Sequence, residues 1–67
     1  MSQLGETNQR IRRAWKHADN LANQLIMIAD TYKGDFPGFA ATAEKLAEGA
    51  LLIREGVNGL NRLLNKL

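Results

Sequence analysis

The chain has 67 residues, of which 45% are hydrophobic and 24% charged, with no cysteine and one histidine. This composition predicts one small globular domain, residues 1–67, and excludes a fold held by disulfides or by a zinc site. The net charge is only +2, no apolar run is long enough to cross a membrane, and no signal peptide is visible, so we expect a soluble cytoplasmic protein. A chain this short rarely buries enough apolar surface to be stable alone, so we also expect it to self-associate.

A first helix is predicted over about residues 7–33. Apolar residues recur there at the three- and four-residue spacing of a core-facing helix. One row is Ile11, Ala18, Leu25 and Tyr32, and a second is Ala14, Leu21 and Ile28. Thr7 is the expected N-cap, with Ser2 as the alternative.

A turn is predicted at residues 34–35, within the only strong cluster of helix breakers, 33–38. Gly34 is expected to end the first helix in a left-handed conformation, with Lys33 in the last helical turn. Asp35 is the expected N-cap of the next helix, and Pro37 fits its first turn.

A second helix is predicted over about residues 36–66 because two apolar heptad rows run through it without a break. They are Phe36, Ala43, Ala50, Val57 and Leu64, and Phe39, Leu46, Ile53, Leu60 and Leu67. Two such helices joined by a short turn must pack antiparallel, each presenting its stripe to the other. The predicted fold is therefore all-α, an antiparallel two-helix hairpin that assembles into a homo-oligomeric helical bundle.

An oligomer interface is predicted from apolar residues that lie off these rows and from two glycines seven residues apart inside the second helix. The expected interface residues are Ile26, Met27, Gly49, Leu51, Leu52, Gly56 and Leu63. The glycines, which follow Thr42 in one column, suit either close approach of another helix or a notch for a ligand.

Charge is distributed unevenly. Residues 1–17 contribute +3 and residues 54–67 contribute +2, whereas residues 18–53 contribute −3. In an antiparallel hairpin the two basic segments meet at one end, which attracts phosphate. The predicted phosphate contacts are Arg10, Arg13, Lys16, His17, Arg62 and Lys66, with Asn58, Asn61 and Asn65 as amide donors nearby. Trp15 or Tyr32 would stack on a base, Trp15 being favoured. The alternative is a solubilising charged face.

Catalytic signals are nearly absent, so we predict that the protein is not an enzyme. No nucleophile motif, phosphate-binding glycine loop or metal-ligand spacing occurs, and no metal or cofactor is expected. His17 is read as a solvent-facing or phosphate-contacting residue and not as a general base, and the pair Glu44 and Glu48 as part of a solvated face.

Residues 45–57 resemble a helix of phage anti-CBASS cyclic-nucleotide sponges and of the related hairpin domain of anti-Thoeris sponges. The shared pattern is Lys45, Leu46, Glu48, Gly49 and Val57, with Leu52 where the family tends to have Trp and Arg54 where it tends to have Asn. Residues 18–28 loosely resemble the family's first helix. The resemblance implies homo-oligomeric hairpins that bind a cyclic nucleotide without cleaving it.

The functional prediction is therefore a non-enzymatic sponge that sequesters a small anionic nucleotide immune signal, a cyclic oligonucleotide or a cyclic ADP-ribose type, and so counteracts host defence. Its partners would be further copies of itself and that nucleotide, with no membrane. One alternative is a homodimeric RNA-binding regulator similar to plasmid Rop, for which RNA would be the partner. Another is a small inhibitor that blocks a host protein.

Overall fold

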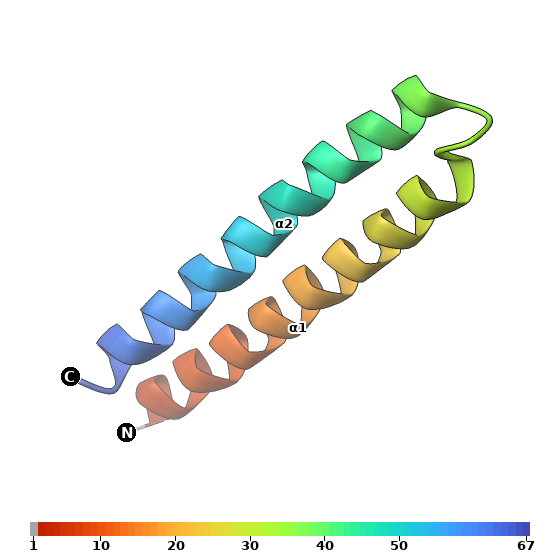
Figure 1. Cartoon of the computed structure of the whole chain (residues 1–67). Helices are drawn as coiled ribbons and strands as arrows, with labels where there is room; N and C mark the ends of the chain where they lie inside the picture. The colour runs from red at the N-terminus through yellow and green to blue at the C-terminus, as the bar shows by residue number, and fades with distance from the viewer. Residues whose placement is uncertain (1) are drawn as a thin grey trace.

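The computed structural model describes residues 2–67, and side chains from residue 3 onward. Two helices, α1 (Ser2–Tyr32) and α2 (Pro37–Leu64), run antiparallel and bring the two ends of the chain together (Figure 1). The described part contains no strand, which confirms the all-α hairpin. The pair is long and thin, 52 × 15 × 10 Å. Neither helix has the length and apolarity needed to cross a bilayer.

The helix ends differ from the prediction in three places. The first helix already includes Ser2, upstream of the expected cap at Thr7, and it ends at Tyr32, so Lys33 lies just beyond its last turn. No described glycine has a positive φ, so the left-handed cap expected at Gly34 is wrong. The N-cap of α2 is Phe36, without a side-chain cap, and not Asp35, although Pro37 does occupy the first turn.

Backbone hydrogen bonds and aromatic packing hold the turn instead. The Phe36 N–H donates to the Tyr32 carbonyl at 2.8 Å, so the chain reverses directly from the end of α1. The Tyr32 ring lies 5.2 Å from that of Phe39, edge to face, and 6.0 Å from that of Phe36. These contacts shield the turn without the special backbone conformation that only glycine adopts readily.

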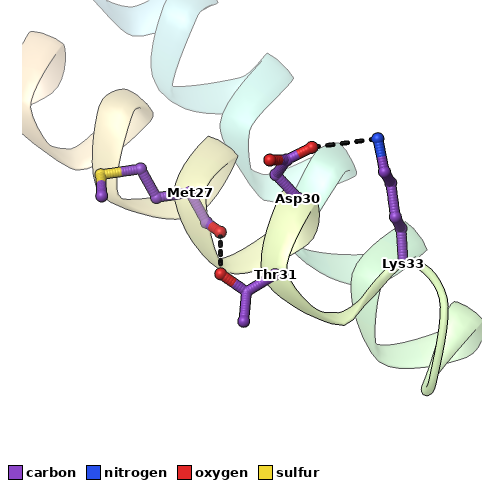
Figure 2. A network of polar contacts seen from close by, with 4 residues as sticks. All are labelled: Met27, Asp30, Thr31 and Lys33. Atoms are coloured by element: carbon purple, nitrogen blue, oxygen red, sulfur yellow. Dashed lines mark hydrogen bonds and ion pairs between the residues drawn. The ribbon is translucent and has the colours of Figure 1, made fainter.

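Local polar contacts complete the last turns of α1, as Figure 2 shows. The Thr31 hydroxyl donates to the Met27 carbonyl at 2.8 Å. Lys33 Nζ lies 3.0 Å from Asp30 Oδ1, with both side chains largely in solvent. An exposed pair of this kind adds little stability, so the aromatic cluster is the stronger constraint on the turn.

The helices are joined along a seam of alanines. Among the described side chains, the buried ones are Ala18, Ala22, Ala29, Ala40, Ala43, Ala47, Ala50 and Val57. A methyl group is the largest side chain at most of these positions, so the two backbones approach closely over the middle and the turn end. No large side chain among residues 3–67 is fully buried.

Only one of the two heptad rows of α2 faces α1. The row Ala43, Ala50 and Val57 is buried, as predicted, but the row Phe39, Leu46, Ile53 and Leu60 is exposed. Leu21 and Ile28, from the corresponding row of α1, are also exposed. The prediction that the helices turn their whole stripes toward each other is therefore wrong. The inner rows are flanked in the seam by the alanines that follow them by four residues, Ala22, Ala29, Ala40 and Ala47, and not by the second apolar row.

The glycines of α2 play no part in this seam. A Cβ atom added at Gly49, Gly56 or Gly59 would meet no other atom within 4 Å. Close approach inside the hairpin therefore depends on alanine, and the small column of Gly49 and Gly56 remains free on the surface.

We expect Ala43→Leu to destabilise the hairpin by about 1–3 kcal/mol, because a longer side chain must push the two backbones apart. Ala41→Leu is the matched control, since Ala41 is exposed only two residues away. Urea denaturation followed by circular dichroism measures both variants. Equal stability of Ala43→Leu and Ala41→Leu would contradict close packing along the seam.

Candidate functional site

The most site-like feature is a groove between the helices at the basic end. Its volume is about 400 Å³, at the low end of the range for small-molecule sites. The lining residues are Asn8, Ile11, Arg12, Trp15 and Lys16 from α1, Val57, Asn58 and Asn61 from α2, and Asn65 just beyond the end of α2. We call this feature the asparagine groove.

The groove exists because the alanine seam stops before the chain ends. One column of α1 reads Asn8, Trp15, Ala22 and Ala29 at seven-residue intervals. The facing column of α2 reads Ala40, Ala47, Arg54 and Asn61. Where alanine meets alanine the helices close on each other, and where larger or polar side chains replace alanine a groove remains.

The chemistry of the lining suits an anionic, aromatic ligand. Arg12 and Lys16 supply cations, and no carboxylate lines the groove. Charged donors bind phosphate oxygens strongly, and arginine does so with two parallel hydrogen bonds. Asparagine amides both donate and accept, which matches the edge of a nucleobase. Trp15 offers an indole ring on which a base can stack.

Arg54 links this groove to the seam. Its Nη1 lies 2.5 Å from Asp19 Oδ1, an ion pair between the helices whose side chains are about one third exposed. The Arg54 guanidinium carbon also lies 5.6 Å from the centroid of the Trp15 ring. The two contacts fix the register of the helices and hold the Trp15 ring at the inner end of the groove.

The residues predicted to bind phosphate lie on different sides of the basic end. Only Lys16 lines the asparagine groove. Arg10 lines a separate hollow beside Glu6, Leu64 and Leu67. The remaining predicted contacts are exposed and line neither hollow: Arg13, His17, Arg62 and Lys66. The structure thus does not gather the six into one site.

The two predicted stacking residues are far apart. Trp15 lines the groove, whereas Tyr32 packs against Phe36 and Phe39 at the turn. They are separated by seventeen helical residues, or roughly 25 Å at 1.5 Å per residue. A single small ligand therefore meets only one of them, and the groove favours Trp15.

Arg12 and Asn8 were not singled out from the sequence as ligand contacts, although both line the groove. Their signal was the spacing: Asn8, Arg12 and Lys16 recur every four residues, on one face of α1. Asn58, Asn61 and Asn65 are three and four residues apart, which likewise places them on one face at the C-terminal end of α2. Pairing these two faces required the register that the Asp19–Arg54 contact sets.

The predicted interface residues also divide between sides. Ile26 and Leu51 line another hollow on the same side as the groove, toward the turn, with Glu44 and Glu48. Met27 and Leu52 are 67% and 72% exposed, and both point away from the opposite helix.

Within the described residues, no group of three or more histidine or acidic side chains is placed to hold a metal ion.

Comparison of the chain with models of protein families, with curated proteins and with solved structures finds no match.

We expect the Asp19–Arg54 pair to show a coupling free energy of roughly 0.5–1 kcal/mol in a double-mutant cycle, because both side chains are partly withdrawn from water. The variants are Asp19→Ala, Arg54→Ala and both together, measured by urea denaturation. Asp30 and Lys33 form the control pair, whose side chains are 73% and 74% exposed. Their coupling should be close to zero, and equal values for the two pairs would contradict a register role for Arg54.

Proposed function

We propose that the protein binds a small anionic nucleotide in the asparagine groove and sequesters it without chemical change. The observation that carries this proposal is the groove itself, in which Arg12, Lys16 and Trp15 lie beside four asparagines. A phosphate would contact the two cations, and a base would lie against Trp15 with amide groups along its edge. The ligand class is a cyclic oligonucleotide or a cyclic ADP-ribose type, in agreement with the sponge resemblance.

Sequestration, and not turnover, is proposed because the groove offers binding groups without an evident nucleophile or general base. Its polar side chains are amides, one guanidinium and one ammonium group. Guanidinium and ammonium groups donate hydrogen bonds and have no acceptor lone pair, and amides do not act as bases. Binding the signal intact would lower its free concentration and so counteract a defence that depends on it.

Self-association belongs to the same proposal. The hairpin leaves large apolar side chains such as Phe39, Leu46 and Ile53 more than half exposed. Exposed apolar surface of this extent marks an interaction site. A homo-oligomer would cover it and would present several grooves per assembly.

RNA is the second candidate ligand, because several cations point outward and not into the groove. Arg13, Arg62 and Lys66 are exposed and line none of the hollows described above. Exposed cations at one end of the hairpin suit the phosphates of a structured RNA, as in the Rop-like alternative. Its affinity would fall steeply with salt, since phosphate contacts release counterions.

Isothermal titration calorimetry with cyclic dinucleotides, cyclic trinucleotides and cyclic ADP-ribose isomers tests the proposal. We expect one class to bind and to be recovered unmodified after the protein is denatured by heat. Because Trp15 is the only tryptophan, ligand binding should also change the intrinsic fluorescence.

Arg12→Ala should weaken this binding by about ten- to a hundredfold, the cost of one charge-assisted phosphate contact of roughly 1.5–3 kcal/mol. Arg13→Ala is the matched control, because it removes the same charge from the neighbouring position outside the groove. Equal losses in the two variants would argue against the groove. A cleaved product would show an enzyme, and salt-sensitive binding to structured RNA alone, weakened by Arg13→Ala, would establish the Rop-like alternative.

A further inference from the structure

One side of the hairpin carries a continuous row of large apolar side chains. Leu21, Ile28, Phe39, Leu46, Ile53 and Leu60 are between 37% and 60% exposed. We call these six residues the apolar face. Charged and amide side chains interrupt every other side of the hairpin, so this face is the part that water solvates least well.

Both helices contribute to the same side. Successive residues are about 100° apart around a helix axis. Leu21 and Leu46 each come three residues after an inner row position, Ala18 and Ala43, so their rows lie beside the seam at the same rotation on both helices. Because the two helices run antiparallel and face each other, equal rotation places both rows on the same side of the hairpin. The hollow lined by Thr7, Arg10, Leu64 and Leu67 confirms this, because Thr7 and Leu67 continue those rows by further heptads. The asparagine groove opens on the other side.

We infer that a second copy of this chain covers the apolar face, with the two turns at opposite ends and α2 against α2. The product is an antiparallel four-helix bundle with two-fold symmetry. The inference rests on the self-association proposed above and is independent of the ligand. It names the pairing face, which differs from the surface of Ile26, Leu51 and Leu52.

The side of the hairpin that carries the apolar face is large enough for a stable dimer interface. The hairpin presents an outline of 52 by 15 Å on this side, or about 800 Å². Interfaces of standard size bury about 800 Å² on each partner. Isologous pairing needs a single self-complementary patch, and the four residues that α2 contributes to the apolar face are centred near the middle of α2.

Charge decides between the two possible orientations. The half of the hairpin next to the chain ends carries +5, from residues 1–17 and 54–67, and the half next to the turn carries −3, from residues 18–53. With both turns at one end, like charges would face each other along the whole bundle. With the turns at opposite ends, each basic half lies on an acidic half, which is favourable.

This orientation also explains the exposed glycines Gly49 and Gly56 of α2. It sets α2 of one copy against α2 of the other. A two-fold axis near residue 51, close to the midpoint of α2, puts residues that are equally distant from position 51 beside each other. Leu46 of one copy then lies beside Gly56 of the other, and Ile53 lies beside Gly49. Large side chains thus meet positions where an added Cβ finds open space in the single hairpin. Large beside small is the packing that permits close helix approach.

Leu46→Glu tests the face, and Leu52→Glu is its control on the same helix. Leu52 is 72% exposed and points away from both α1 and the predicted partner. By analytical ultracentrifugation we expect the native chain and Leu52→Glu to sediment as dimers and Leu46→Glu to dissociate at least a hundredfold more readily. Dissociation by Leu52→Glu and not by Leu46→Glu would overturn the assigned face while leaving self-association intact. A monomeric native chain would overturn both.

Cross-linking tests the orientation in an otherwise native chain, which contains no cysteine. Gly49→Cys lies near the predicted axis, and Gly34→Cys lies in the turn, where a Cβ likewise meets no neighbour. A short bismaleimide should join two copies through position 49 and not through position 34. Joining through position 34 would show the turns at the same end and overturn the orientation, whether or not a nucleotide binds.

Discussion

The alanine seam is the constraint on which the rest of this hairpin depends. Alanine at Ala22, Ala43 and Ala47 lets the two backbones approach closely, and it leaves no space between them for a large side chain. Leucine, isoleucine and phenylalanine must therefore lie outside the seam. The core of the single hairpin therefore consists of small side chains, and its large apolar side chains lie on the surface. A hairpin of this kind gains little stability from apolar burial. Its large apolar side chains stay exposed to water unless another surface packs against them.

The interruption of the seam is as informative as the seam itself. The same two columns that carry alanine toward the turn carry Asn8, Trp15, Arg54 and Asn61 toward the chain ends. Closure at one end and a groove at the other thus follow from a change of residue type along a fixed heptad position. Arg54 marks the boundary, because it reaches Asp19 across the seam and also approaches the Trp15 ring. The groove is therefore built on rigid helices and not on a loop, which favours a preorganised binding site.

The two surfaces that we propose as functional lie on opposite sides of the hairpin. The asparagine groove opens on one side, and the apolar face of Leu21, Leu46 and Ile53 lies on the other. Pairing of two copies through the apolar face would leave both grooves open to solvent. Ligand binding and self-association are therefore separable, and a substitution on one surface can be interpreted without reference to the other.

The sequence by itself determined that the chain forms two antiparallel helices, where the turn lies, and that the charges separate between the two ends, because heptad periodicity and helix breakers are local signals. It did not determine which row would face inward. The two apolar rows of a helix have the same seven-residue period, so periodicity alone cannot distinguish them. Only the packing of one helix on the other shows that the row flanked by alanines is the buried one. The ligand set shows the same division. Arg10, Arg12, Arg13 and Lys16 are near neighbours in sequence, but helical rotation separates Arg12 and Lys16 from the others, and the register set by Asp19 and Arg54 aligns them with the asparagines of α2.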